Sequence, residues 1–299
     1  MISQTTKGWL LFCGLLILIS LSLSSCASYP LTPLPEAEVV ELADSCREIY
    51  TEQIDAWISA DYDRVRDVYT EDVVHFDGGP VFVSVDEVVE MARWMNLFLS
   101  DYTQDAGDTY ISASDCLGTW LLWGAKGLTE EDPRREFDLI ETRDGKISFW
   151  RLFYGEKFDF APINKDLLSQ FAETLPTGRS RAMKEIYAED AVLVDSLFGV
   201  EAQGLDEILG YTAGFKKAYS VKGWELLIPF SEVIDSDAAP PDFIPSHGGV
   251  YRITSTDDQG DICYVNAVVI LTPNQEGKIS QQLVYYQADS LIECGWLTE

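Results

Sequence analysis

The stretch VYTEDVVHFD at residues 68–77 recurs 118 residues later as IYAEDAVLVD at residues 186–195. Two shorter matches follow in the same order: DEVV at residues 86–89 with DEIL at 206–209, and GKIS at residues 145–148 with GKIS at 277–280. Ordered matches of this kind are the sequence signature of an internal duplication. We therefore predict that the chain contains two copies of one domain.

Hydrophobic periodicity predicts a similar element order in both copies. Apolar residues at helical spacing over residues 36–60 predict a long first helix. The first copy should continue with a short helix at 63–69, a strand at 73–77, a helix from about residue 84, one long or bent strand at 109–128, and strands at 135–141 and 146–154. The second copy should have helices at 167–175, 180–187 and 205–218 and strands at 191–195, 223–234, 249–255, 262–271 and 278–287. Each copy is thus expected to place helices before most of its strands.

The repeated stretch resembles a motif of the SnoaL-like (polyketide cyclase-like) branch of the nuclear transport factor 2-like proteins. The matching residues are Tyr69, Asp72, Val73, Val74 and Asp77 in the first copy and Tyr187, Asp190, Ala191, Val192 and Asp195 in the second. A helix-start signature of that branch resembles residues 86–88 and 204–208. The resemblance implies an α+β fold of tandem cone-shaped domains, each with about three N-terminal helices packed on a strongly bent antiparallel sheet. We place the domains at residues 36–161 and 162–299.

The N-terminus reads as an export signal. Residues 1–25 contain one cation, Lys7, and an apolar run at residues 9–23, which is shorter than the roughly 20 residues of a membrane-spanning helix. Leu23-Ser24-Ser25-Cys26 resembles the lipobox of bacterial lipoproteins, which implies cleavage before Cys26 and lipidation of its thiol. Residues 26–35 carry three prolines and predict an extended tether. We expect an extracytoplasmic protein, lipid-anchored to the cell membrane or outer membrane. An uncleaved anchor or an ordinary secreted protein remains the alternative.

The composition excludes some partners. Lys and Arg total 21 against 50 Asp and Glu, for a formal net charge of −29. Such acidity excludes nucleic acid, since phosphate binding needs a basic surface. It favours solubility over any specific cationic partner.

Four cysteines remain once Cys13 leaves with the signal and Cys26 is lipidated. They are Cys46, Cys116, Cys263 and Cys294, two in each copy. An oxidising compartment favours the pairs 46–116 and 263–294, although four cysteines allow three connectivities and buried free thiols are common. With only His75 and His247, we expect no metal site, and no cofactor motif is found.

His75 and Asp77 are the best candidates for chemistry. They lie two residues apart on one expected strand, so both side chains face the same side. There His75 could act as acid or base with Asp77 orienting it, and Asp138 and Arg151 could reach the same space. The structural alternative is a hydrogen-bonded rim histidine and an aspartate that caps the turn. The second copy has Leu193 at the position of His75, which weakens catalysis.

Other candidates could line a pocket. Asp195 could pair with Tyr211 or Tyr286, and Trp94, Trp123 and Trp150 suit a flat apolar ligand. The simpler interpretation is that the aspartate caps a turn and the aromatic residues fill two small cores. His247, after a proline-rich loop, is expected at an exposed hairpin entry.

Three functional hypotheses follow. The first is a membrane-anchored module that binds a small apolar ligand or an envelope partner without catalysis. The second is a cofactor-independent cyclase, isomerase or dehydratase that uses His75 and Asp77. The third is a pseudo-dimer in which the two copies pack through their sheets.

Overall fold

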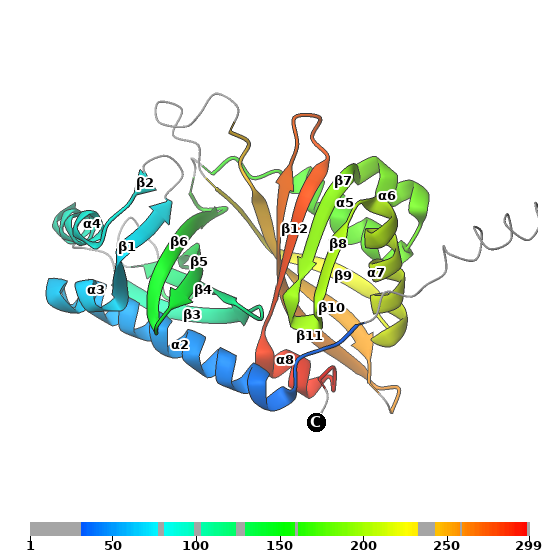
Figure 1. The fold of residues 1–299 in the computed structure, drawn as a ribbon, viewed down its shortest axis with the longest axis horizontal. Helices are drawn as coiled ribbons and strands as arrows, with labels where there is room; N and C mark the ends of the chain where they lie inside the picture. The colour runs from blue at the N-terminus through cyan, green and yellow to red at the C-terminus, as the bar shows by residue number, and fades with distance from the viewer. Residues whose placement is uncertain are drawn as a thin grey trace, which may run out of the picture.

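The computed structural model describes residues 31–76, 81–98, 103–123, 129–158, 161–232, 243–257 and 259–297. The expected signal, Cys26, most of the tether and Asp77 lie outside these ranges. We call residues 31–158 the first half and residues 161–297 the second half. Figure 1 shows each half as a strongly curved sheet with helices packed against it, which confirms the predicted α+β class.

The first half begins with a 23-residue helix, α2 (Glu36–Ile58), that starts directly after Pro35. Its buried residues recur every three or four positions, as an amphipathic helix requires. The elements that follow are α3 (Tyr62–Val68), β1 (Tyr69–Phe76), β2 (Val81–Phe82), α4 (Val85–Phe98), β3 (Thr103–Ile111), β4 (Asp115–Trp123), β5 (Arg134–Arg143) and β6 (Lys146–Gly155). Asp144 and Gly145 both have positive φ in the tight turn between β5 and β6, the conformation of a two-residue hairpin turn.

The second half repeats much of this order. Its elements are α5 (Lys165–Thr174), η2 (Leu175–Thr177), α6 (Ser180–Ile186), β7 (Tyr187–Asp195), η3 (Ser196–Phe198), β8 (Val200–Gln203), α7 (Leu205–Ala218), β9 (Gly223–Ser231), β10 (His247–Thr256), β11 (Ile262–Pro273), β12 (Ile279–Tyr286) and α8 (Ala288–Glu293). The short helices η2 and η3 and the terminal helix α8 have no counterpart in the first half as described.

Two sequence expectations need correction. The single strand expected at 109–128 is wrong, because β3 and β4 form a hairpin that turns at residues 112–114. The Ser112 hydroxyl accepts hydrogen bonds from the amides of Ser114 and Asp115 and fixes this turn. The exposed position expected for His247 is also wrong, since its side chain is buried at the start of β10.

Parallel strand pairs add to the antiparallel sheet in both halves. Strand β1 runs parallel to β6, and β7 runs parallel to β12. Parallel neighbours need a long connection, and several elements separate β1 from β6 and β7 from β12 along the chain. The sheets are therefore mixed.

The eight remaining long strands close into a ring. Their hydrogen-bonded order is β3-β4-β5-β6-β9-β10-β11-β12, and β12 returns to β3. The two junctions between halves are short, with Tyr154 and Gly155 of β6 on β9 and Ile111 of β3 on Tyr286 of β12. Closure leaves none of these strands with a fully open edge.

An apolar cluster from both sheets fills the space between the halves. Phe137 of the first half stacks on Phe230 of the second, with ring centroids 4.1 Å apart. The cluster consists of Tyr110, Leu117, Phe137, Leu139, Phe153, Phe230, Val250, Val268, Ile270 and Tyr285. Because strand side chains alternate, the opposite face of each sheet points toward its own helices and contributes to a second, larger core.

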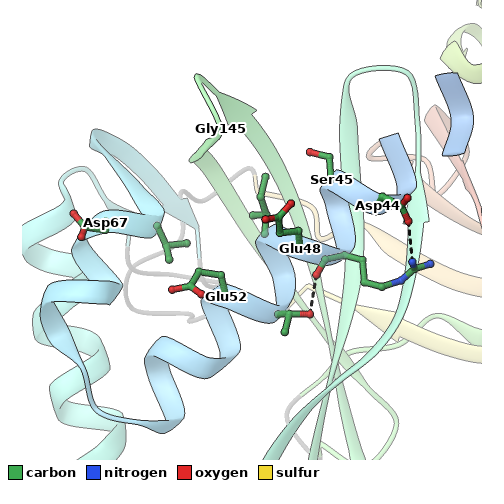
Figure 2. Close-up of a pocket in the computed structure, with 10 residues that line it drawn as sticks. Asp44, Ser45, Glu48, Glu52, Asp67 and Gly145 are labelled. Atoms are coloured by element: carbon green, nitrogen blue, oxygen red, sulfur yellow. Dashed lines mark hydrogen bonds and ion pairs between the residues drawn. The ribbon is translucent and has the colours of Figure 1, made fainter. Parts of the chain in front are cut away.

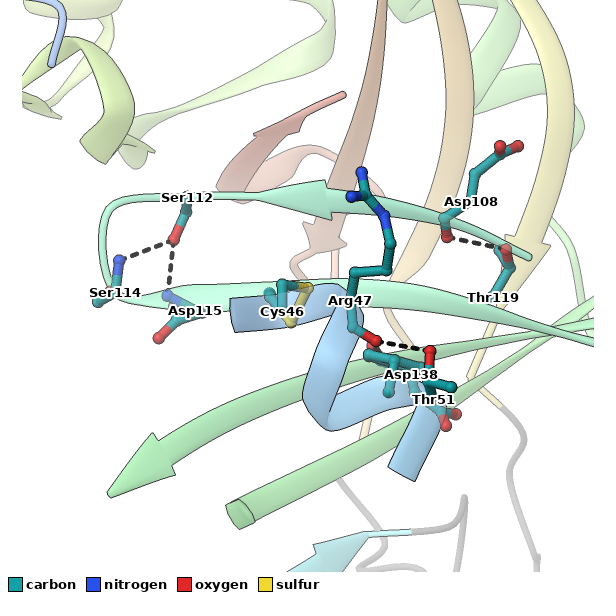
Figure 3. Close-up of a disulfide and its surroundings, with 11 residues drawn as sticks. Cys46, Arg47, Thr51, Asp108, Ser112, Ser114, Asp115, Thr119 and Asp138 are labelled. Atoms are coloured by element: carbon teal, nitrogen blue, oxygen red, sulfur yellow. Dashed lines mark hydrogen bonds between the residues drawn. A yellow bond between two sulfur atoms is a disulfide. The ribbon is translucent and has the colours of Figure 1, made fainter. Parts of the chain in front are cut away.

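Two disulfides join helices to strands. Cys46 of α2 is bonded to Cys116 of β4, and Cys263 of β11 is bonded to Cys294 just after α8 (Figure 3 shows one disulfide with Cys46 labelled). These are the two intra-copy pairings considered from the sequence. Among the described residues, no helix is long and apolar enough to cross a membrane, and no group of three or more His, Cys, Asp or Glu side chains could hold a metal ion.

Candidate functional site

The predicted catalytic histidine lies in the interior of the first half. His75 is opposite Trp150 in the parallel β1–β6 pair, and its side chain has no exposed surface. Its ring packs edge-on against Trp150 at a centroid distance of 3.9 Å and also contacts Phe82. Burial lowers the pKa of His75 to about 3, so the ring is neutral across the physiological range.

Strands and α2 together surround His75 with buried polar and aromatic side chains. We call this set the first-half cluster: Tyr50, Gln53, Trp57, Tyr69, His75, Trp120, Asp138 and Trp150. All eight residues have at most 3 % of their surface exposed. The helix contributes three of them because Tyr50, Gln53 and Trp57 recur at spacings of three and four residues on its buried face.

Three tryptophans form the framework of the cluster. The rings of Trp57 and Trp150 meet edge-on at 5.4 Å, and those of Trp57 and Trp120 do so at 5.8 Å. Tyr69 packs beside Trp150 at 5.7 Å. Such edge-to-face contacts are favourable for aromatic pairs and hold the indole rings in fixed orientations.

Asp138 brings a carboxyl group into the same interior. It lies on β5 beside Gly118 of β4, and the Tyr50 hydroxyl donates to its backbone carbonyl. Burial raises the pKa of Tyr50 and Tyr69, and the charge of Asp138 raises both further. Gly118 is required here, because a Cβ at this position would lie 2.3 Å from the Tyr50 ring.

Several polar atoms of the cluster have no hydrogen-bond partner among the described residues. They are both ring nitrogens of His75 and the indole N–H groups of Trp120 and Trp150. The Gln53 and Trp57 side chains lie beside the Tyr69 hydroxyl and lower its pKa through hydrogen bonds. Buried polar atoms in proteins are normally paired, so a concentration of unpaired ones marks a place where another molecule is accommodated.

Three residues predicted to share this space lie elsewhere. Trp94 is 57 % exposed on α4, because the buried positions of that helix are occupied by smaller residues such as Val88 and Ala92. Trp123 and Arg151 lie one residue out of phase with Trp120 and Trp150, so strand alternation places them on the opposite face of the sheet. Arg151 instead pairs across the halves.

The Arg151 ion pair joins β6 to the end of β9. Its Nε lies 2.5 Å from the Glu232 carboxylate, which is fully buried, and its guanidinium also donates to the Ser246 hydroxyl. The amide of Ser246 donates to the second oxygen of Glu232. This charge is therefore committed to the junction between halves, not to the first-half cluster.

The second half has a buried carboxyl of its own. Asp195, at the end of β7, accepts hydrogen bonds from the hydroxyls of Tyr211 at 2.5 Å and Tyr286 at 2.7 Å. Burial raises the pKa of Asp195 to about 7, and the two tyrosines and the Phe198 amide partly oppose this rise. Both tyrosines considered from the sequence thus bind the same carboxyl oxygen.

Register comparison shows how the two interiors differ. Tyr69 and Tyr187 occupy the same position against the last strand, as do His75 and Leu193. In the same register Trp150 corresponds to Gln282, Asp138 to Val269 and Trp120 to Tyr251. The hydroxyl of Tyr187 donates to the Gln282 side chain. The second interior therefore joins these polar side chains by hydrogen bonds. In the first interior, the ring nitrogens of His75 and the indole N–H groups of Trp120 and Trp150 form none among the described residues.

An open groove lies outside the first half, between α2, α3 and the β5–β6 turn (Figure 2). It has a volume of about 810 Å³ and is bordered by Asp44, Ser45, Arg47, Glu48, Ile49, Thr51, Glu52, Asp67, Val68 and Gly145. Two of its carboxylates are engaged, Asp44 by Arg47 and Glu52 by Arg64. The groove is solvated and its ion pairs are exposed, so they contribute little free energy.

Sequence reasoning missed Tyr50, Gln53, Trp57 and Tyr69 as site residues. Three of them, Tyr50, Gln53 and Trp57, lie on the buried face of one helix. Gln53 was the signal for this group, because a glutamine on the apolar face of a predicted helix is unusual. Nothing in the sequence indicated that β5 and α2 would bring Asp138 to these residues.

No protein-family profile matches the chain, and no curated protein matches it in sequence. Solved structures align with part of the chain. A protein of unknown function with a cystatin-like fold from Methylobium petroleophilum is 18 % identical, with a TM-score of 0.32 over 38 % of this chain and 76 % of that one. An NTF2-like protein of unknown function from Cytophaga hutchinsonii is 9 % identical, with a TM-score of 0.30 over 36 % and 88 %. An LEH-like epoxide hydrolase from M. tuberculosis is 17 % identical, with a TM-score of 0.30 over 38 % and 83 %.

Proposed function

We propose that this chain is a lipid-anchored extracytoplasmic binding protein with two tandem SnoaL-like domains, of which the first holds a small polar ligand and the second is structural. The observation that carries the proposal is the contrast between the interiors. Among the described residues, both ring nitrogens of His75 and the indole N–H groups of Trp120 and Trp150 are buried in the first half without a hydrogen bond. Tyr187 and Asp195 are paired within the second half.

The donors and acceptors of the first-half cluster define the ligand's chemistry. Indole N–H groups only donate, so Trp120 and Trp150 require acceptor atoms such as a carbonyl oxygen. The neutral ring of His75 has one acceptor nitrogen, which suits a donor on the ligand. A planar group that carries both, such as an amide on a flat ring, satisfies these requirements. Because the indole rings contact one another, the ligand enters by separating them.

The geometry favours binding over catalysis. A general base works best when its pKa lies near the operating pH, and burial holds the pKa of His75 far below that range. The hypothesis of a cyclase, isomerase or dehydratase that uses His75 and Asp77 is therefore the weaker one. The enzyme hypothesis would gain support if the chain turned over a substrate at a rate that rose with a pKa near neutrality. This pH dependence would have to disappear in His75→Asn.

A matched pair of probes tests the binding proposal. Benzamide carries an acceptor and donors, whereas α-methylstyrene has nearly the same shape without them. Tryptophan fluorescence should report saturable binding of benzamide and at least tenfold weaker binding of α-methylstyrene. The difference reflects the cost of leaving buried donors unpaired, about 1–3 kcal/mol each.

Two variants locate the site. Trp150→Phe keeps an aromatic ring but removes one indole N–H, and it should weaken benzamide binding. Tyr187→Phe, at the register position of Tyr69 in the other half, should leave binding unchanged. Equal affinity for both probes, or equal effects of both variants, would contradict a donor-lined site in the first half.

The anchor is tested separately. Cys26→Ser should move the protein from the membrane fraction to the soluble fraction of cells and abolish the mass of an N-terminal lipid. A Cys13→Ser variant is the control, because the expected cleavage removes that residue. Membrane retention of Cys26→Ser would contradict lipidation at this position.

A further inference from the structure

The buried ring of His75 is covered on one side by Phe82. The two residues lie directly opposite each other in the antiparallel β1–β2 pair, so both side chains point to the same face of the sheet. Their ring centroids are 5.4 Å apart. Of the two rings that the described residues pack on His75, Trp150 is buried and Phe82 is only partly buried. Phe82 is therefore the ring that separates His75 from water.

Strand β2 supplies this cover with one side chain. It is two residues long, and β1 is its sole hydrogen-bonded neighbour among the described strands. Val81 and Val83, on either side of Phe82, are 51 % and 60 % exposed, because successive side chains of an extended segment point to opposite faces. They consequently add nothing to the cover over His75.

The backbone that carries Phe82 is fixed to the start of α4. The Val83 amide donates to the Glu87 carboxylate at 2.7 Å, and the Val88 amide donates to the Ser84 carbonyl at 3.3 Å. Access to His75 therefore requires rotation of the Phe82 side chain and not loss of β2. Turning out a ring that is already partly exposed transfers less apolar surface to water than turning out the buried Trp150 would.

The second half has no such cover. In the matching register, Leu193 stands for His75 and Ala202 stands for Phe82. Both residues are fully buried, and an alanine has no side-chain rotation that could open a path. A large ring at this position thus occurs in the half whose interior holds the unpaired histidine, which links Phe82 to the site and not to the shared fold.

We propose that Phe82 is the gate of the ligand site in the first half: its ring closes the path to His75, and a ligand enters when the ring turns toward solvent. The rate of entry is then set by how often the ring is turned out. This inference rests on the proposed function for the identity of the site, but access to His75 can be measured without a ligand.

Chemical modification of the full chain in detergent tests the gate. Diethyl pyrocarbonate acylates neutral imidazole rings, and the chain has two histidines, His75 and His247. Peptide mass spectrometry follows each of them separately. Phe82→Ala should raise the rate at His75 roughly tenfold, because such a rate follows the population of the open form. The rate at His247, which is buried in the second half, should not change.

Phe153→Ala is the matched control for general destabilisation. It removes the same atoms from the core between the halves and should leave the rate at His75 near that of the wild type. No rise in Phe82→Ala, or an equal rise in Phe153→Ala, would overturn the gate. Phe82→Leu keeps part of the cover and should give a smaller rise, which supplies the test if Phe82→Ala fails to fold.

Benzamide kinetics separate the gate from the proposed ligand. In stopped-flow tryptophan fluorescence, Phe82→Ala should speed association and dissociation of benzamide by similar factors and leave its Kd nearly unchanged. Benzamide binding with unchanged rates in this variant would overturn the gate. Faster modification of His75 without any binding of benzamide to the wild type would contradict the proposed ligand and support the gate.

Discussion

At the scale of single residues, the first half is defined by polar side chains buried without partners. His75 is the clearest case, since both ring nitrogens lack a hydrogen bond among the described residues and its exposed surface is zero. Leaving such groups unpaired costs free energy that an apolar residue of similar size avoids. The first half nevertheless has His75 at this position, whereas the second half has Leu193 at the same register position.

His75→Leu should therefore raise the free energy of unfolding at pH 7 by about 1–2 kcal/mol. Urea denaturation monitored by circular dichroism measures this change. The matched control is Gln282→Leu, which leaves the Tyr187 hydroxyl unpaired and should lower stability by about 1–3 kcal/mol. Destabilisation by His75→Leu would show that the ring has a partner of its own.

His75 and Asp195 should give opposite pH dependences. The pKa of His75 is about 3 in the folded chain against 6.5 as its ordinary value, so its contribution to stability is lost as pH falls from about 6.5 toward 3. The pKa of Asp195 is about 7 against 3.8, so its contribution is present at low pH and is lost as pH rises from about 4 to 7. Each slope approaches about 1.4 kcal/mol per pH unit, and the two largely cancel between pH 4 and 6.5.

Single variants should separate these slopes. Between pH 4.5 and 6.5, His75→Leu should lose stability with rising pH relative to the wild type, and Asp195→Asn should gain it. Urea midpoints at several pH values measure both. Parallel profiles for the two variants would contradict the assigned burial of one of these groups.

At the scale of elements, the site depends on how closely α2 approaches β4. Cys46 and Cys116 bond the two elements covalently, and Gly118 allows the Tyr50 ring to lie on the strand. This contact also brings Gln53 and Trp57, one and two turns further along α2, to the face that carries His75.

Gly118→Ala should lower the free energy of unfolding by about 3 kcal/mol, because the added Cβ would meet the Tyr50 ring at 2.3 Å. Gly223→Ala is the control on another strand, where a Cβ meets nothing within 4 Å, and its effect should stay within about 0.5 kcal/mol. Thermal unfolding of both variants compares them directly. Similar effects at the two positions would mean that strand propensity, not the Tyr50 contact, decides the cost.

At the scale of the whole molecule, the two halves share one closed ring of strands. The apolar residues between them include Phe137 and Phe153 from the first half and Phe230 from the second. Separation would expose this surface to water, and exposed apolar patches of this kind promote association. The halves are therefore expected to depend on each other for solubility.

A fragment of residues 36–161 should aggregate or self-associate, whereas a chain of residues 27–299 should not do so at the same concentration. Size-exclusion chromatography with light scattering distinguishes these outcomes. Arg151 would also lose its partner Glu232 in the fragment. A folded, monomeric fragment would contradict the proposed dependence.

The sequence by itself predicted a similar element order in both halves, most strands and helices, and two cysteine pairs as one of three possible connectivities. These follow from local periodicity and spacing, which depend on residues close together in the chain. It also offered Tyr211 or Tyr286 as a partner of Asp195, beside the simpler interpretation that this aspartate caps a turn. The β3–β4 hairpin was not separated from the sequence, although Ser112, Ser114 and Asp115 are typical turn residues.

Only the tertiary structure decided which side chains meet. Strand alternation places Trp123 and Arg151 on the face of the sheet opposite to His75. The packing of α2 on the sheet brings Gln53 and Trp57 into the same interior as His75. Pairing of polar groups is likewise a property of distant contacts, since Tyr187 finds Gln282 across 95 residues of sequence. Whether a buried polar group is satisfied cannot be read from its neighbours in the chain, and that difference is what distinguishes the first half from the second.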